Sequence, residues 1–241
     1  MEPDRSNPGT TMLAIETTQR VGSVAVSVPG RAVLESSFPC GSREQDGLLP
    51  AIDEVLAQAD CSPGDLSVVA VSIGPGSFTG LRIATSTAKA LALGIGCRLI
   101  GVPSAWGVAA QWYRDTEDDG PVLVASAAKG TDCWLTRLER SEAGLCETES
   151  TGLHRIDHPS ADVRRMSEGA VLLADDFIPS NFIKSCKELI RECRPPHHSA
   201  HGCLLAARQL EEADCFSAAA SLEPIYPREP EAVTLWRARN G

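Results

Sequence analysis

Residues 71–96, VSIGPGSFTGLRIATSTAKALALGIG, place a glycine-rich turn between a β-branched run and a helix. The run at residues 68–73 is almost wholly apolar, which is typical of a central strand covered on both faces. The turn at residues 74–76 sets two conformationally permissive glycines around a rigid proline, and Ser77 can cap the helix that follows. This order of elements predicts an α/β fold, and the free N–H groups at the start of the helix would favour an anion.

The turn does not complete a nucleotide-binding motif. A P-loop requires Gly-Lys-Ser/Thr after the turn, whereas Phe78 and Thr79 follow Ser77. A Ser–His–acid site could be assembled from Ser77, one of five histidines and a carboxylate, but no Gly-x-Ser-x-Gly elbow supports it. We therefore expect neither a P-loop site nor a serine nucleophile here.

The helix after the turn is small or apolar around most of its circumference. At 100° per residue, its polar side chains gather with Leu93 in an arc of about 100°, and they are Arg82, Thr85, Ser86 and Lys89. A helix with so wide an apolar surface is usually buried on more than one side. Its cover could be the rest of its own chain or another protein, and the pattern alone favours neither.

Charge, length and cysteine usage limit the classes of function. The chain has 241 residues and a formal net charge of −10, which disfavours a protein that holds nucleic acid without a partner. No apolar run approaches the roughly 20 residues that cross a bilayer, and the polar start lacks the features of a secretion signal. Nine scattered cysteines without a Cys-x-x-Cys pair indicate free thiols in a reducing compartment. We expect a cytoplasmic protein without membrane contact.

Hydrophobic periodicity predicts two α/β units. We expect a disordered lead over residues 1–11, an N-terminal lobe over 12–114 and a smaller C-terminal lobe over 115–241, divided by the charged run after residue 113. A β-meander opens the first lobe, and residues 222–226 form a final short strand or docking segment. The other expected strands lie at 68–73, 98–102, 122–126, 133–138 and 171–174, and the helices at 44–59, 77–94, 105–113, 161–166, 179–193 and 199–213.

Several motifs occur together in this chain: MLAIETT at 12–18, SRE at 42–44 with LLP at 48–50, GPGSFTGLR at 74–82 and LEPIY at 222–226. Together they resemble one family, TsaB (YeaZ). The likeness extends from Met12 to about Gly107 and returns near the C-terminus. Members of this family are accessory subunits in the synthesis of threonylcarbamoyladenosine at position 37 of tRNA.

The resemblance implies a two-lobed fold of the actin, Hsp70 and sugar-kinase type (ribonuclease H-like), with mixed sheets and a degenerate second lobe. It implies a non-catalytic scaffold subunit that binds and activates the TsaD transferase, with the ATPase TsaE docking across the pair. Because a large apolar surface rarely stays exposed, we expect the chain to form a homodimer when alone. Because the chain is acidic, we expect it to contact tRNA only through the complex. The chain would hold no cofactor or metal of its own, and ATP and metal would belong to the partner subunits.

The same resemblance assigns residues. The interface helices would be residues 43–59 and 77–94, and Ala84→Arg or Ala88→Arg should abolish co-purification with TsaD while leaving thermal stability nearly unchanged. Glu16 and Thr17 are candidates for a vestigial nucleotide site, although a structural charge is the favoured interpretation of Glu16. The motif turn is Gly74, Pro75 and Gly76. The expected partner contacts are Arg43, Leu48, Leu49, Ile52, Ser77, Phe78, Gly80, Leu81, Arg82, Ile83, Ala84, Thr87, Ala88 and Leu91.

The chain departs from the family pattern at three places. Glu16 stands where members usually carry Asp, Gly41 where many carry His, and residues 126–129 read SAAK where Asp-Ala-Arg is common. Two alternatives therefore stay open: a stand-alone ATP-dependent kinase or transferase of the same superfamily, or a diverged member with another partner.

A cluster of cysteines and histidines lies at residues 193–203, CRPPHHSAHGC. Zinc uses such ligands, but their spacing matches no familiar zinc motif. We expect a solvated turn followed by a helix cap, and no metal site.

Overall fold

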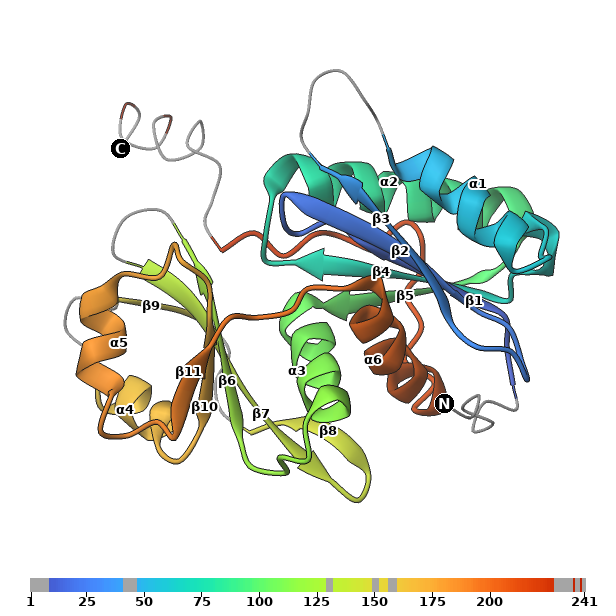
Figure 1. Ribbon diagram of the computed structural model, residues 1–241. Helices are drawn as coiled ribbons and strands as arrows, with labels where there is room; N and C mark the ends of the chain where they lie inside the picture. The colour runs from blue at the N-terminus through green and yellow to red at the C-terminus, as the bar shows by residue number, and fades with distance from the viewer. Residues whose placement is uncertain are drawn as a thin grey trace.

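The computed structural model describes residues 9–40, 47–128, 132–148, 152–155 and 160–227, together with Trp236 and Arg239. Two lobes, each built on a mixed sheet, lie side by side with two helices between them (Figure 1). The predicted two-lobed α/β architecture with mixed sheets is confirmed.

The first sheet has the order β3-β2-β1-β4-β5. Its strands are β1 (Met12–Glu16), β2 (Val21–Ser27), β3 (Leu34–Pro39), β4 (Val68–Gly74) and β5 (Arg98–Pro103). The first three form the predicted antiparallel meander, whereas β4 pairs in parallel with both β1 and β5. The parallel register sets Ile15 beside Val71, so the end of β1 and the glycine turn after β4 meet at one edge.

The second sheet repeats this pattern in the order β11-β10-β6-β7-β8, with β9 paired to β7. Its strands are β6 (Val122–Ala127), β7 (Asp132–Ser141), β8 (Gly144–Glu147), β9 (Gly152–Arg155), β10 (Val171–Ala174) and β11 (Glu192–Arg194). Its outer helices, α4 (Ala161–Ser167) and α5 (Ser180–Cys186), have only seven residues each. The second lobe is thus reduced in its helices and complete in its sheet.

One predicted helix is wrong in its second half. The helix expected at 179–193 ends at Cys186, and β11 follows it. Residues Glu192–Arg194 pair in parallel with β10, and the Arg191 N–H donates to the Ala170 carbonyl at 2.8 Å. Extending the sheet by one strand satisfies these backbone groups, so tertiary pairing outweighs local helix propensity.

Helices cover both faces of the first sheet. On one face, α1 (Leu48–Gln58) and α2 (Phe78–Ile95) pack on side chains such as Ile15 and Val71, with a 3-10 turn (Pro63–Asp65) beyond α1. On the other face, α6 (Ala200–Glu212) packs on Met12, Ala14 and Ala70. None of the helices in the described part of the chain has the length and apolar character needed to cross a bilayer.

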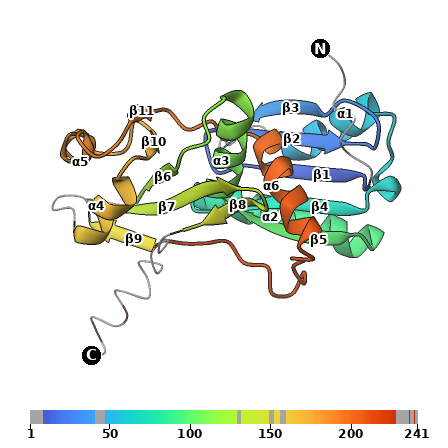
Figure 2. The same ribbon diagram turned by 90° about the horizontal axis from the view of Figure 1, so that it is seen from below.

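The two lobes are joined where α6 crosses α3 (Ser104–Asp115), as Figure 2 shows from below. A Cβ on Gly202 would collide with the Gly107 carbonyl oxygen, so the two backbones meet without side chains between them. Farther along α6, the Gln209 carboxamide accepts from the Leu145 N–H at 2.7 Å and donates to the Leu145 carbonyl. Since Leu145 lies on β8 of the second sheet, α6 holds both lobes together.

The end of the chain returns to the first lobe, which corrects the predicted domain boundary. Helix α6 covers the first sheet, and the tail after it runs beside β5, where the Ser217 N–H donates to the Leu99 carbonyl. The tail then reaches the end of β4, where the Ile225 N–H donates to the Ile73 carbonyl. Residues 200–226 therefore do not belong to a separate C-terminal lobe. Most of the predicted disordered lead lies outside the described residues, but Thr10 inside it is ordered and donates its hydroxyl to Glu211 at 2.8 Å.

Helix α2 is buried on one side only. Ala84 and Ala88, both 0% exposed, pack in the core of the first lobe against the sheet, and Leu81 is equally buried. Thr85 was expected in the polar arc, but it is buried too, and its hydroxyl donates to the Leu81 carbonyl at 2.7 Å. The expectation that arginine at position 84 or 88 would spare stability is therefore wrong.

Ala84→Arg is expected to lower the free energy of unfolding by about 3–5 kcal/mol, because it forces an unpaired charge and excess volume into a filled core. Urea denaturation of the purified variant measures the change. Ser86→Arg is the matched control on the exposed side of the same helix, and its effect should stay within about 0.5 kcal/mol. Equal stabilities of the two variants would contradict the helix orientation described above.

Candidate functional site

The outward side of α2 carries an uncovered stripe of small and apolar residues. It is formed by Thr79, Ile83, Ser86, Ala90 and Leu93, at spacings of three and four residues. Ile83 is 42% exposed and Leu93 75% exposed. None of the described residues covers this face, so it is open to another molecule or to a second copy of the chain.

Two glycines of the motif fix the position of α2. A Cβ on Gly80 would collide with the Thr17 carbonyl oxygen, and one on Gly76 would collide with Thr18, so only glycine allows this approach. The Ser77 N–H donates to the Thr18 carbonyl at 2.8 Å, and the Ser77 hydroxyl caps the helix by accepting from the Gly80 N–H at 3.3 Å. The turn begins at Gly74, whose φ of 97° also favours glycine. The motif thus locks the start of α2 against the end of β1.

The tail extends the apolar surface at the start of α2. Tyr226, 37% exposed, lies with its ring centroid 5.1 Å from that of Phe78, and the Arg82 guanidinium lies 5.3 Å from the Phe78 ring. The bond from the Ile225 N–H to the Ile73 carbonyl holds the tail in this place at 2.7 Å. The segment singled out at residues 222–226 is therefore a docking segment on the glycine motif, with Leu222 buried beneath it.

Helix α1 adds one large apolar side chain to the surface. Leu49 is 54% exposed, whereas Leu48 and Ile52 face the core. Glu54 accepts from the Ser36 hydroxyl at 2.9 Å, which turns that side of α1 toward β3. We define the α1–α2 face by its exposed residues: Leu49, Phe78, Arg82, Ile83, Ser86, Ala90, Leu93 and Tyr226.

The structure divides the predicted partner contacts into four groups. Leu49, Ser77, Phe78, Arg82 and Ile83 are exposed, and Gly80, Thr87 and Leu91 are partly exposed. Arg43 lies outside the described residues. Leu48, Ile52, Leu81, Ala84 and Ala88 are buried in their own chain, so their assignment as partner contacts is corrected.

Sequence reasoning missed Ala90, Leu93 and Tyr226. A helix with apolar residues on every side gives no signal of which side faces the sheet, and the close approach at Gly80 is visible only in three dimensions. Had the glycine been used to set the phase of the helix, the stripe through Ile83 and Leu93 would have followed from the 3.6-residue period.

Polar side chains at the end of β1 form a hydrogen-bond network with the segment before α6. The Glu16 carboxylate, 3% exposed, accepts from the Thr18 N–H at 2.6 Å and from the Thr18 hydroxyl. The Thr18 hydroxyl donates its proton to Glu16, so it can only accept a hydrogen bond from His198 Nδ1, at 3.1 Å. With the imidazole proton on Nδ1, His198 Nε2 accepts from the Gln19 side-chain amide at 3.3 Å. Burial lowers the pKa of His198 below its usual value of 6.5, and the charges of Glu16 and Asp175 oppose that shift.

These residues do not fit a nucleotide. The Glu16 oxygen that would position a metal already accepts two hydrogen bonds, and β6 ends at Ser126 and Ala127 without a carboxylate. Thr17 and Thr18 lie against the glycine turn where a phosphate would approach. Lys129 lies outside the described residues. The favoured interpretation of Glu16 as a structural charge agrees with this network.

The cysteine and histidine cluster does not come together. Cys203 is buried, with its Sγ 4.0 Å from the Ile15 carbonyl, whereas Cys193 is exposed on β11. Within the part of the chain that the structure describes, no group of three or more His, Cys, Asp or Glu side chains is placed to hold a metal. Ser199 caps α6 by accepting from the Gly202 N–H at 2.9 Å, as expected for a turn and helix start.

Comparison with known proteins supports the resemblance seen in the sequence. Residues 42–146 match the family model of TsaD, tRNA N6-adenosine threonylcarbamoyltransferase. The chain is 32% identical over 141 residues to the tRNA threonylcarbamoyladenosine biosynthesis protein TsaB of Escherichia coli, which covers 58% of this chain and 60% of that protein. It is 26% identical over 166 residues to TsaB of Buchnera aphidicola from Schizaphis graminum, covering 69% and 79%. The match to the Escherichia coli protein thus spans less than two thirds of its length.

Solved structures show the same fold. A Pseudomonas aeruginosa protein described as similar to peptidase YEAZ superposes with a TM-score of 0.78 over 91% of this chain and all of the other, at 19% identity. YeaZ of Pseudomonas aeruginosa superposes with a TM-score of 0.73 over 90% of this chain, also at 19% identity. The predicted resemblance to the TsaB (YeaZ) family is confirmed in sequence and in fold.

The lowered pKa of His198 predicts that the stability of the chain depends on pH. Because the pKa of His198 is lower in the folded chain than its usual value, its contribution is complete above pH 6.5 and is lost as the pH falls through the folded-state pKa. His198→Gln should therefore reduce the loss of stability between neutral and acidic pH, measured by urea denaturation. His197→Gln, at the exposed neighbour, is the control and should keep the wild-type dependence. Identical slopes for all three proteins would exclude this role of His198.

Proposed function

We propose, from its TsaB-like sequence and fold, that this chain is a non-catalytic subunit required for threonylcarbamoylation of tRNA adenosine 37, and that it binds and activates the TsaD transferase. The α1–α2 face carries the proposal. Among the described residues, nine large hydrophobic side chains are exposed, and five of them lie on this face: Leu49, Phe78, Ile83, Leu93 and Tyr226. Contiguous exposed apolar side chains mark protein interaction sites.

Among the described residues, the candidate catalytic side chains are engaged in other contacts, which favours an accessory role. Ser77, the candidate nucleophile, serves as the helix cap, and His198 is engaged by Thr18 and Gln19. Among the hydrogen bonds of the described residues, none joins Ser77 to a histidine. These contacts favour a scaffold over both the peptidase named for a structural relative and the alternative of a stand-alone kinase.

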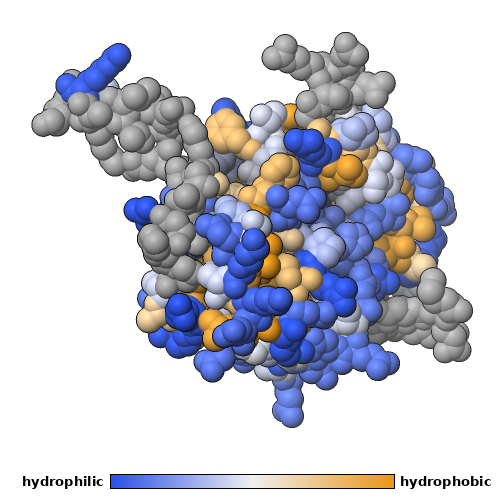
Figure 3. Space-filling model, turned by 60° about the vertical axis from the view of Figure 1, so that its left-hand side comes forward, coloured by the Kyte–Doolittle hydropathy of each residue, from blue (hydrophilic) through white to orange (hydrophobic). Residues whose placement is uncertain are grey.

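The surface of the chain suggests how the work is divided in a complex. Because the chain has a net charge of −10, the partner would have to supply the basic surface that binds tRNA. Seen from the side of the second lobe, most of the surface is hydrophilic (Figure 3). A stable pair buries about 1,600 Å² in total, which two helices and a tail can supply in part. ATP and metal would act on TsaD and on the ATPase TsaE, in the cytoplasm. Alone, the chain would pair with a second copy through the same face.

Ile83→Arg should abolish co-purification with TsaD and convert the isolated chain to a monomer, because it sets a charge in the middle of the apolar face. Threonylcarbamoylation of tRNA by the reconstituted system, together with pull-down and light scattering, measures the effect. Leu153→Arg in the second lobe is the matched control, since Leu153 is 39% exposed and Ile83 42%. A full complex with Ile83→Arg would overturn the proposal.

The isolated chain should not bind Mg-ATP in calorimetry, because the carboxylate of Glu16 is engaged and β6 ends without a carboxylate. Micromolar binding with turnover would favour the kinase alternative. TsaD under the same conditions provides the positive control.

A further inference from the structure

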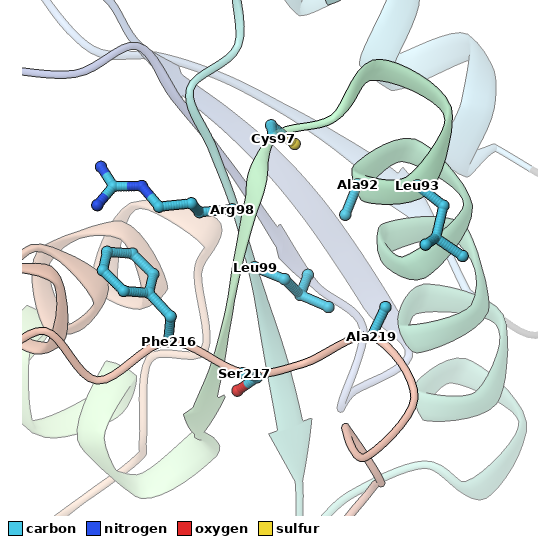
Figure 4. A pocket seen from close by; sticks show the side chains of 8 residues that line it. All are labelled: Ala92, Leu93, Cys97, Arg98, Leu99, Phe216, Ser217 and Ala219. Atoms are coloured by element: carbon cyan, nitrogen blue, oxygen red, sulfur yellow. The ribbon is translucent and has the colours of Figure 1, made fainter.

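A hollow lies beside the C-terminal end of α2, between that helix and the tail (Figure 4). Its volume is about 250 Å³, and its walls include Leu93, Leu99, Phe216 and Ala219. Sites for whole small ligands range from about 300 to 1,000 Å³. This hollow is smaller and mainly apolar, which suits a single inserted side chain. Leu93 forms one wall and is also part of the α1–α2 face.

The same side of α2 carries two cations. Phe78, Arg82, Lys89 and Leu93 share one arc of the helix, with Lys89 one turn before the hollow. Among the described residues, no carboxylate lies within ion-pair distance of Arg82 or Lys89, whereas Arg98 beside the hollow pairs with Glu211 at 3.1 Å. In a chain with 32 acidic and 22 basic residues, two uncompensated cations on an apolar helix are complementary to an acidic partner.

The opposite wall is held in place by the sheet. The Ser217 N–H donates to the Leu99 carbonyl at 2.7 Å, and the Ser217 hydroxyl accepts from the Gly101 N–H at 3.3 Å. At the far end of the tail, Tyr226 reaches Phe78. A groove wall that is already ordered costs little conformational entropy when a partner binds.

We propose that TsaD engages this groove with an acidic segment. One apolar side chain of that segment enters the hollow, and its carboxylates pair with Lys89 and Arg82 as it extends toward Phe78 and Tyr226. The inference rests on the proposed function and deepens it: the tail at residues 216–226 becomes a second wall of the interface, and charge fixes the direction in which the partner lies along α2.

Filling the hollow from within tests the apolar contact. Ala219→Phe places a ring where the partner side chain would enter, and should weaken TsaD binding about tenfold or more in calorimetry while leaving the melting temperature unchanged or higher. Ala218→Phe is the matched control, since Ala218 is exposed and does not line the hollow. Native affinity with Ala219→Phe at an undiminished melting temperature would overturn the inference. If the phenylalanine variant is unstable, Ala219→Leu provides the same comparison with a smaller side chain.

The charges are tested by salt dependence. The double variant Arg82→Gln, Lys89→Gln should associate with TsaD more slowly and lose most of the salt dependence of the association rate. Lys184→Gln, Lys187→Gln in the second lobe is the control and should keep the wild-type dependence. Equal salt slopes in both double variants would refute the acidic segment. If Ile83→Arg abolishes the complex but the groove variants do not, the proposed function stands and this inference fails; if Ile83→Arg has no effect, both fail.

Discussion

The approach of Gly80 and Gly76 to the backbone of Thr17 and Thr18 determines how the rest of the surface is presented. The contact fixes the start of α2 on the end of β1, and the helix period then decides which residues face the sheet. Ala84 and Ala88 fall inside, and Ile83 and Leu93 fall outside. Any side chain at position 80 would push the helix away from the Thr17 carbonyl, so a partner would meet a different surface.

The first lobe depends on chain segments that are far apart in sequence. Its sheet comes from residues 12–103, but α6 covers one face and the tail covers the edge beside β5. Helix α6 packs closely on α3 where Gly202 meets Gly107. Gln209, farther along α6, forms hydrogen bonds with Leu145 of the second sheet. For this reason the first lobe is not one continuous segment of the sequence. The α1–α2 face is completed by Tyr226, which lies near the end of the chain.

The meander, the central strand β4 and the two long helices of the first lobe could be predicted because their periodicity is strong and local. The side of α2 that faces the sheet could not be predicted, because apolar residues occur on every side of the helix. The sheet covers some of them and leaves others exposed: Leu81, Ile83, Ala84, Ala88, Leu91 and Leu93. The positions of Gly76 and Gly80 do show which side of α2 faces β1, because only glycine allows the close approach to Thr17 and Thr18. This is a steric constraint, and hydrophobic periodicity does not detect it. Similarly, β11 was predicted as helix because its pairing with β10 is invisible in three residues of sequence.

The hydrogen-bond network around His198 and the exposed face of α2 both depend on how the end of β1 is held. Glu16, Thr18 and Gln19, at the end of β1, hold His198 in the segment that leads from β11 to α6. Beside them, Arg20 lies 5.8 Å from the Phe177 ring of the second lobe. These contacts fix the end of β1 against the segment that returns from the second lobe. Hydrogen bonds from the tail to the first sheet hold it beside α2, so α2 and the tail can meet a partner as a preformed surface. A chain that leaves a helix face of this kind exposed is suited to act through contact with another protein.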